Sequence, residues 1–230
     1  MAPGFLAVFS EPGANVTIDE YQDWYDNEHI PIRLDHLPSF LTGARYSASD
    51  SLRPSWLAVY DVDDTATFQH ESYTRLRANR SPREADVVKR LELLDRRTYE
   101  LVADENKGLT SSYHPRDPTK FIMTHGIECP DGERLKGWLD ATVENLRKVE
   151  GWTRTRIYKC IDNLKSGMGV GSGKEEQKVP EYLAIHGEVG FFLHGDVNLT
   201  MARSQNSCIQ QHLTPLRSNR LSNSIRRILR

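Results

Sequence analysis

The chain has 230 residues, of which 38% are hydrophobic and 27% charged, and its formal net charge at pH 7 is −2. This is the composition of a globular protein with room for one large domain or two small ones. The near balance of charge excludes a global field that would draw the chain to nucleic acid or to a membrane surface. Three widely spaced cysteines without zinc-ligand spacing favour a reducing, cytoplasmic environment. We expect neither a signal peptide nor a segment that crosses a bilayer.

The first hundred residues alternate between strand and helix signals. An apolar run at 5–9 predicts a buried strand, and the capping box at 17–20 starts a helix whose apolar residues recur at three- and four-residue steps. Because Pro31 lacks an N–H and disfavours helical geometry at Ile30, this helix is expected to kink or stop there. The elements expected next are strands at 40–47 and 56–61, a helix at about 65–80, a second helix capped by Ser81, and a strand at 97–102.

After a linker at 104–119, rich in Gly, Ser, Pro and charge, the pattern repeats. The elements expected in the second half are a strand at 121–125, a helix capped by Asp131, strands at 152–161 and 182–186, a polar helix and a strand at 224–229. The order β-α-β-β-α-β, found twice, predicts an α+β fold of two tandem ferredoxin-like units that form a pseudo-dimeric α/β barrel. The units would span 1–105 and 119–230, with a Gly-rich mobile loop at 164–178 in the second.

The segment 25–31, Tyr-Asp-Asn-Glu-His-Ile-Pro, is the strongest chemical signal in the chain. His29 is the best candidate for a general acid or base, because the unperturbed pKa of histidine is about 6.5. The alternative is that His29 has no catalytic role and that its partly positive ring only stabilises the C-terminal end of the helix by interacting with the helix dipole. Adjacent helical residues diverge by about 100°, so Asp26 or Glu28 can orient the ring only if the helix unwinds near Pro31.

These residues resemble the fungal EthD-domain proteins of the dimeric α/β-barrel superfamily. The resemblance covers about 5–102 and rests on the segments 24–33, 45–46, 56–60 and 77–84. The second half lacks the Glu-His-x-Pro element, so motif-borne chemistry is expected once per chain. The resemblance implies cofactor-free cyclases, dehydratases, decarboxylases or monooxygenases, or haem-dependent members, with a small-molecule cavity between sheet and helices.

The candidate site is built from these residues. His29 would be the acid/base, Tyr25 would donate to a developing oxyanion, and Arg33 would hold a carboxylate or phenolate. The candidate substrate-binding residues are Trp24, Glu28, Tyr46, Trp56, Tyr60, His125 and His186. For the last two, a core or interface role is the alternative. No His, Cys, Asp and Glu spacing indicates a metal site, and no cofactor is expected.

The resulting hypothesis is a cofactor-independent enzyme of fungal-type secondary metabolism that acts on a polyketide-like small molecule. The reaction would be cyclisation or isomerisation, dehydration or decarboxylation. One alternative is a cofactor-free or haem-dependent monooxygenase of the same superfamily, and another is a non-catalytic binding or structural module. We expect no nucleic-acid or membrane partner, and the sequence leaves open whether two chains form a homodimer.

Overall fold

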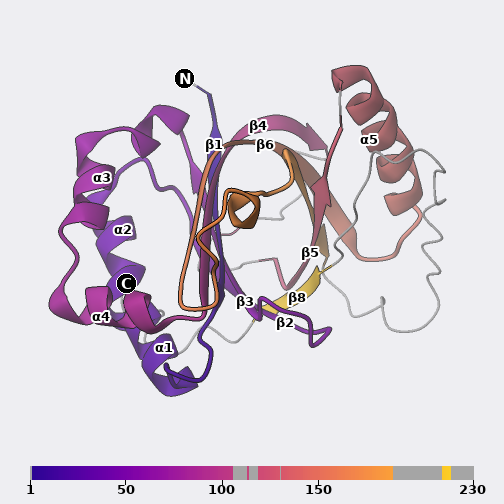
Figure 1. Cartoon of the computed structure of the whole chain (residues 1–230). Coiled ribbons are helices and arrows are strands. Elements are labelled where there is room, and N and C mark those ends of the chain that lie inside the picture. Colours follow the sequence, from indigo (N-terminus) through magenta and orange to yellow (C-terminus); the bar gives the residue numbers. More distant parts are fainter. Residues whose placement is uncertain (1, 106–112, 114–118, 130, 189–213, 219–230) are drawn as a thin grey trace.

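The computed structural model describes residues 2–105, 113, 119–129, 131–188 and 214–218. Within these residues, eight strands close into one barrel in the order β1-β3-β2-β8-β5-β7-β6-β4 (Figure 1). Every neighbouring pair is antiparallel. Closure leaves the barrel without a free sheet edge, and it also buries the sheet face that the helices do not cover.

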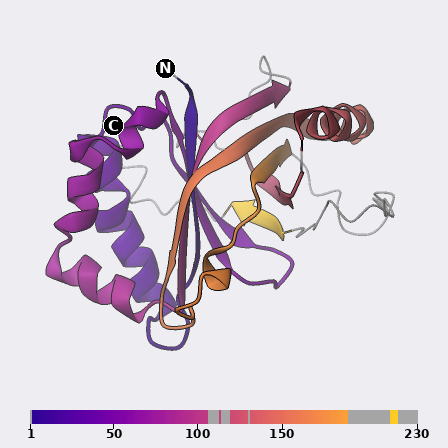
Figure 2. The same ribbon diagram turned by 45° about the horizontal axis from the view of Figure 1, so that its top comes forward.

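The first half supplies four adjacent strands of the barrel in the order β4-β1-β3-β2. Its elements are β1 (Gly4–Glu11), α1 (Ile18–Trp24), the π-helical turn η1 (Tyr25–His29), α2 (Pro31–His36), β2 (Ala44–Ala48), β3 (Trp56–Val62), the 3-10 helix η2 (Thr65–Phe68), α3 (Glu71–Ala78), α4 (Pro82–Arg90) and β4 (Leu93–Glu105). The four α-helices of this half lie together on the outer side of the barrel (Figure 2). Strand and helix therefore alternate as β-α-β-β-α-β.

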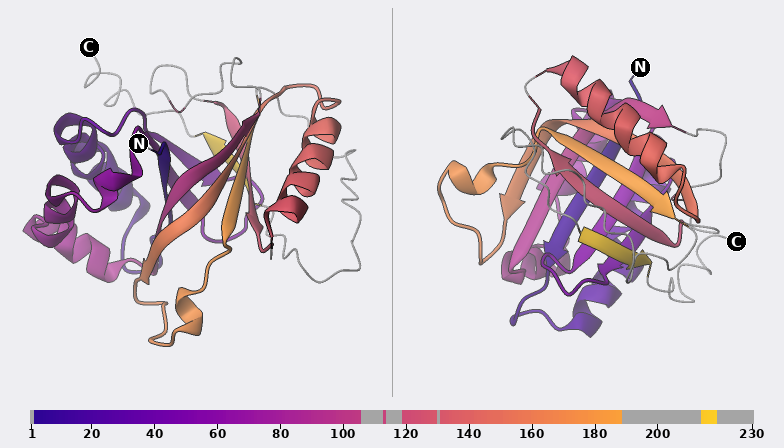
Figure 3. Two further views of the ribbon diagram at one scale, coloured as in Figure 1. Left: turned by 90° about the horizontal axis from the view of Figure 1, so that it is seen from above. Right: turned by 90° about the vertical axis from the view of Figure 1, so that its right-hand side faces the viewer.

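The second half supplies the other four strands in the order β8-β5-β7-β6. Its described elements are β5 (Phe121–Ile127), α5 (Gly132–Leu146), β6 (Trp152–Ser166), the 3-10 helix η3 (Glu175–Gln177), β7 (Tyr182–Glu188) and β8 (Thr214–Ser218). Helix α5 begins at the expected cap, because the Asp131 side chain accepts from the backbone N–H of Arg134 at 2.8 Å. It lies on the side of the barrel opposite the helices of the first half (Figure 3). The polar helix expected after β7 and the strand expected at 224–229 fall outside the described residues.

The strands present alternate residues to two different cores, as a period of two requires. On β3, Ala58 and Tyr60 pack under the helices of the first half, and Trp56 packs against that cluster from a half-buried position. Leu57 and Val59 point into the barrel. The period-two alternation of the sequence 56–60 therefore matches the two faces of the strand. The barrel interior is filled mainly by aromatic and branched side chains, among them Phe5, Phe9, Tyr46, Tyr99, Tyr158, Leu183 and Ile185.

Three expected boundaries in the first half are wrong. The strand expected at 40–47 begins only at Ala44, and Phe40 instead makes an isolated bridge to Val62. The single helix expected at 65–80 is divided at His70, whose side chain accepts from the N–H of Ser72 and caps α3. The strand expected at 97–102 is much longer, because β4 pairs with β6 of the other half along most of its length.

Of the two outcomes expected at Pro31, a kink or a stop, the stop is wrong, because the helical backbone continues through Pro31 into α2. The backbone N–H of Ile30 bonds the carbonyl of Tyr25 at 3.1 Å, which is the five-residue step of a π-turn. Pro31 then occupies the first position of α2, where no N–H donor is needed. The helical backbone accommodates Pro31 with a π-turn before it, and this wider turn ends at His29.

The loop expected at 164–178 begins only after Ser166, because β6 runs beyond the expected end of the strand at 161, and backbone hydrogen bonds hold this loop against the first half. The N–H of Met168 bonds the carbonyl of Leu91 at 2.8 Å, and the N–H of Gly169 bonds that of Glu92 at 2.9 Å. Gly167 makes this approach possible. Its φ is +129°, and a Cβ at this position would lie 2.5 Å from the Glu92 carbonyl oxygen.

We therefore predict that Gly167→Ala lowers the free energy of unfolding by about 1–3 kcal/mol, through backbone strain and the clash with Glu92. Gly173 is the matched control from the same loop, because a Cβ there meets no atom within 4 Å. Urea unfolding of both variants measures the difference. Equal stabilities for Gly167→Ala and Gly173→Ala would show that the contact with the first half does not hold the loop.

Candidate functional site

The imidazole of His29 is bonded to a carboxylate from a different helix. Its Nδ1 lies 2.9 Å from Oε1 of Glu84, on α4, and both residues are buried, with 5% and 3% of their surface exposed. Neither Asp26 nor Glu28 takes this place. The ring is oriented by a residue 55 positions later in the chain, which the helix packing brings to it.

The N-terminus of α4 fixes the position of Glu84. Ser81 caps this helix by accepting from the N–H of Glu84 at 2.9 Å, and its hydroxyl donates to the carboxylate of Glu28. Glu28, expected to bind substrate, therefore anchors α4 to the turn that carries His29. Glu28 contacts the N-cap residue Ser81 and His29 contacts Glu84 in the first turn of α4, because side chains of adjacent helical residues point in different directions.

Charges around the pair set its protonation state. Burial lowers the pKa of His29 to about 3, helped by the nearby positive charge of Arg33. Burial alone would raise the pKa of Glu84, but the hydrogen bond from His29 and the charges of Arg33 and Arg80 hold it below its ordinary value. Near neutral pH, Glu84 is therefore ionised and the imidazole is neutral. Nδ1 carries the proton that it donates to Glu84, and Nε2 keeps its lone pair.

Aromatic rings surround the imidazole. The ring centroids of Trp24 and Tyr25 lie 4.5 and 4.9 Å from that of His29. The hydroxyl of Tyr25 lies beside the Ser10–Tyr21 hydroxyl pair, whose oxygens are 2.6 Å apart, and burial raises the pKa of Tyr25. Among the described residues, this apolar shell supplies few groups that can bond the imidazole besides Glu84.

Two arginines brace this shell. The guanidinium of Arg33, expected to bind a substrate oxygen, donates to the backbone carbonyl of His29 at 2.6 Å. The guanidinium of Arg45 lies 4.4 Å from the ring centroid of Tyr25 and donates to Asp26 at 2.8 Å. Trp56, which was predicted to bind substrate, also contacts Arg45, with its ring centroid 5.7 Å from the guanidinium.

Tyr60 belongs to the same cluster and carries an unused donor. Its ring packs 5.6 Å from Phe40, under the helices. Its buried hydroxyl makes no hydrogen bond to any described residue, and burial raises the pKa of Tyr60 above the ordinary range. The structure thus brings together Trp24, Tyr25, His29, Arg33 and Tyr60 of the predicted site, with Trp56 at its margin.

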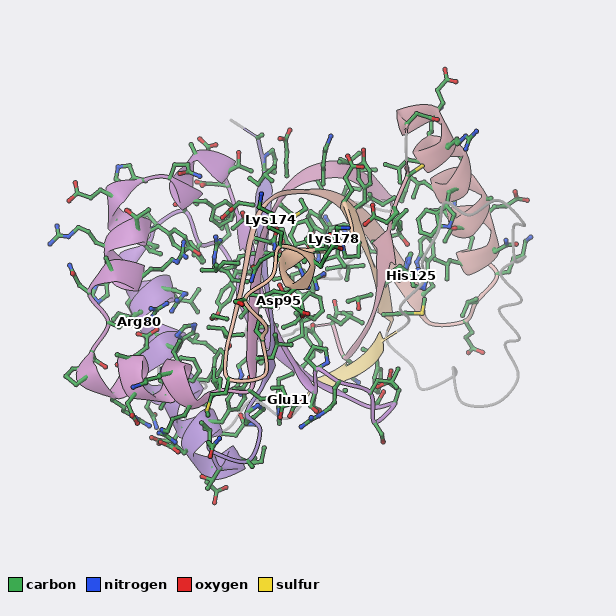
Figure 4. All side chains as sticks on the ribbon, viewed as in Figure 1. Glu11, Arg80, Asp95, His125, Lys174 and Lys178 are labelled. Carbon is green, nitrogen blue, oxygen red and sulfur yellow. The ribbon has the colours of Figure 1, made fainter. Side chains whose placement is uncertain are left out.

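The other predicted residues lie elsewhere. Tyr46 points into the barrel and donates to the carbonyl of Thr119 at 2.9 Å. His125 and His186 lie on the outer face of the second half, where Nε2 of His186 is 3.2 Å from Nδ1 of His125 and the other ring nitrogen of His186 bonds Thr155 at 2.8 Å. Figure 4 shows His125 between the barrel and α5, far from Arg80 in the helices of the first half. These three residues therefore do not share a site with His29.

A cavity of about 580 Å³ lies at one end of the barrel. Two of its lining residues, Asp95 and Arg97, form a buried ion pair with a shortest distance of 2.6 Å, and the guanidinium stacks 4.5 Å from the ring centroid of Phe9. Residues of the loop after β6, such as Gly169 and Val170, line its outer side. No pattern in the sequence indicated this cavity, because its walls come from both halves.

Glu84 is the residue of this candidate site that no pattern in the sequence indicated, although it lies in the segment 77–84 on which the family resemblance rests. The available signal was the sequence Ser81-Pro82-Arg83-Glu84, which is typical of a capping box with its carboxylate in the first turn. That pattern locates the start of a helix and does not show which other helix faces it.

A metal ion fits the described residues poorly, because no group of three or more His, Cys, Asp and Glu side chains in the described ranges can hold one. The imidazole of His29 packs against Trp24 and Tyr25, so a haem at this ring requires both side chains to move, as any other ligand of the ring does. In the described part of the chain, no helix is long and apolar enough to cross a membrane.

No family model matches the sequence, and no curated protein matches it. Solved structures do resemble the fold. An anthrone oxidase-like protein superposes with a TM-score of 0.58 at 9% identity, covering 95% of this chain and 91% of that one. A candidate chlorite dismutase gives 0.54 at 11%, covering 98% of each chain, and a candidate monooxygenase from Fusobacterium nucleatum gives 0.50 at 8%, covering 94% and 92%. At these identities the likeness shows a shared fold.

The buried histidines predict a loss of stability in mild acid. Burial lowers the pKa of His29 to about 3 and of His125 to about 4, and it lowers that of His186 further with help from the charge of His125. The unfolded chain binds protons at these rings below about pH 6.5, whereas the folded chain does not. Stability is therefore complete above that pH and falls as the pH decreases.

We expect the free energy of unfolding to fall between pH 6.5 and 5 by up to about 1.4 kcal/mol per pH unit for each buried histidine. Urea unfolding at several pH values measures this slope, and His186→Gln should make it shallower. A flat profile over this range would show that the three rings are not buried in the neutral form.

Proposed function

We propose that this protein is a cofactor-independent oxygenase that acts on an electron-rich aromatic small molecule, with His29 as the acid/base and Glu84 as its positioning residue. The observation that carries the proposal is the buried hydrogen bond between these two side chains. The proposal includes the finer interpretation of the chain as two diverged ferredoxin-like units, 1–105 and 119–230, of EthD type. The names of the structural neighbours favour oxidation over the lyase or cyclase chemistry expected from the sequence.

The pair performs the proton transfers that such a reaction requires. Nε2 of His29 takes a proton from an acidic C–H flanked by aromatic rings, and the imidazolium so formed keeps its bond to the Glu84 carboxylate. Burial itself disfavours the imidazolium and lowers the pKa of His29 to about 3, and the attraction of the Glu84 carboxylate, which is stronger in a buried pair than in water, opposes that effect when the imidazolium forms. The hydroxyl of Tyr60, which makes no other bond to the described residues, can donate to an oxygen on which negative charge develops.

The oxidation itself needs only dioxygen as a second reactant. The substrate carbanion gives one electron to dioxygen, and the resulting radical pair combines to form a C–O bond. The peroxide takes back the proton held by His29, and the hydroperoxide then loses water to leave a carbonyl. A CH₂ group and O₂ thus become a C=O group and H₂O, so that the carbon loses four electrons and dioxygen gains four.

Access to His29 requires movement of the surrounding side chains. Only 5% of the residue is exposed, and Trp24 and Tyr25 are fully buried against it. A substrate therefore reaches Nε2 when aromatic side chains of this cluster turn aside, as they do when an active site opens. The same apolar shell then closes around the aromatic substrate and excludes water.

The first test uses anthrone as the probe substrate, because one structural neighbour is described as anthrone oxidase-like. Oxygen uptake and anthraquinone formation are measured together. We expect Glu84→Gln to lower kcat by about 10²-fold with little change in KM, because the amide cannot stabilise the imidazolium. The matched control is Glu71→Gln, a change to an exposed residue of α3 whose ion pair is with Arg75.

Three results would contradict the proposal. They are unchanged turnover in folded Glu84→Gln and His29→Ala, equal losses in Glu84→Gln and Glu71→Gln, and substrate consumption without oxygen uptake. Substrate consumption without oxygen uptake would favour the second candidate function, an acid/base lyase or cyclase, because the His29–Glu84 pair can transfer protons without any oxidation step. In that case the mass of the product would show whether water, carbon dioxide or nothing is lost.

A further inference from the structure

A second pocket, of about 510 Å³, lies where the helices of the first half meet β6 of the second half. Helices α3 and α4 and the turn between them contribute Arg77, Arg80 and Lys89 to its lining, and the end of β6 and the loop after it contribute Leu164 and Met168. Figure 4 places Arg80 within the helical layer, well away from Asp95 in the barrel. The pocket is therefore separate from the cavity at the end of the barrel.

The charged side chains that line this pocket are all cationic among the described residues. Arg77 and Lys89 form no ion pair with any described residue. Arg80 reaches only Glu84, at 3.8 Å, and that carboxylate is already bonded to His29. No Asp or Glu side chain is among the described residues that line the pocket.

A fourth cation, Arg96, lies next to the pocket and is only partly satisfied. It pairs with Asp162, yet its buried Nε and Nη1 atoms have no hydrogen-bond partner among the described residues. Burial, followed by the charge of Arg96, lowers the pKa of Arg77, and the charge of Asp162 opposes this shift without reversing it. A bound anion would relieve the repulsion that is left and would supply acceptors to the cationic side chains.

The opposite wall of the pocket is apolar and unusually exposed. Leu164 and Met168 have 45% and 64% of their surface exposed, and Val88 on α4 faces the same pocket. Large aliphatic side chains beside a cationic cluster suit a ligand with a charged head and an apolar body.

We propose that this pocket binds a phosphate monoester that carries an apolar chain. Its dianionic head would lie on Arg77, Arg80 and Lys89, and its chain would lie on Leu164 and Met168. A phosphate monoester fits better than a carboxylate, because near neutral pH it approaches two negative charges and offers three acceptor oxygens to three cationic side chains. The inference does not rest on the proposed oxygenase activity, since binding is measured without turnover.

Calorimetric titration with octyl phosphate, inorganic phosphate and octanoate tests the site. We expect octyl phosphate to bind at least about tenfold more tightly than either of the others, because only it uses both walls. Arg77→Gln and Lys89→Gln should each weaken octyl phosphate binding by about tenfold or more. Arg75→Gln is the matched control. It removes a charge from the same helix, where Arg75 is exposed and pairs with Glu71, and should leave the affinity unchanged.

The melting temperature distinguishes a binding role of Arg77 from a purely structural one. Because Arg77 faces Arg96, Arg77→Gln removes a repulsion and should leave the melting temperature the same or higher in the absence of ligand. A purely structural role for Arg77 would instead lower it. In wild type, octyl phosphate should raise the melting temperature, and in Arg77→Gln this shift should be lost.

Each outcome has a distinct meaning. Absence of octyl phosphate binding, or binding that Arg77→Gln, Lys89→Gln and Arg75→Gln weaken equally, would overturn the proposal.

To identify the source of the ligand, vesicles with and without phosphatidic acid are compared by co-sedimentation. Binding to phosphatidic acid vesicles that depends on Arg77 supports a lipid head group. Binding of octyl phosphate alone supports a soluble ester.

Discussion

The pairing of β4 with β6 is the constraint on which the rest of the structure depends, because these two strands join one half of the chain to the other. With β2 and β8 on the opposite side, they convert two open sheets into one closed barrel. Closure makes the inner face a packed core and leaves the outer face to carry the helices, which enclose His29 against β3. β6 runs beside β4 as far as Ser166, so that Leu164 and, in the loop after it, Met168 line one pocket with residues of α3 and α4. This pocket between the halves therefore depends on the β4–β6 pairing.

The widened turn at Tyr25–His29 is the local feature that the site depends on. A π-turn adds one residue to the helical step, which rotates the side chains after it relative to a regular helix. Here it ends at His29, immediately before the proline that begins α2, and the ring of His29 faces Glu84 of α4. The sequence predicted that Pro31 would disturb the helix, and it does. It did not predict the form of the disturbance, since a stop, a kink and a π-turn all relieve a missing N–H.

Local patterns in the sequence were sufficient for much of the architecture. The caps Thr17, Ser81 and Asp131 begin helices as expected, and the alternation along β3 assigns its two faces correctly. The predictions that failed concern boundaries set by particular contacts. The length of β4 is set by its pairing with β6, and the division of the helix at 65–80 by the His70 side chain, which caps α3. The partner of His29 was missed because 55 residues separate it from Glu84 and no spacing rule connects them.

The two halves use histidine in different ways, and this difference is the reason that we propose acid/base chemistry for the first half. In the first half His29 is bonded to a carboxylate, so a proton gained at Nε2 is stabilised across the ring by Glu84. In the second half His186 bonds His125 and Thr155, and neither partner can offset a positive charge. Burial lowers the pKa of all three rings, and the charge of His125 lowers that of His186 further. The carboxylate bonded to Nδ1, and not the pKa of the resting ring, is therefore what distinguishes His29 from the second pair.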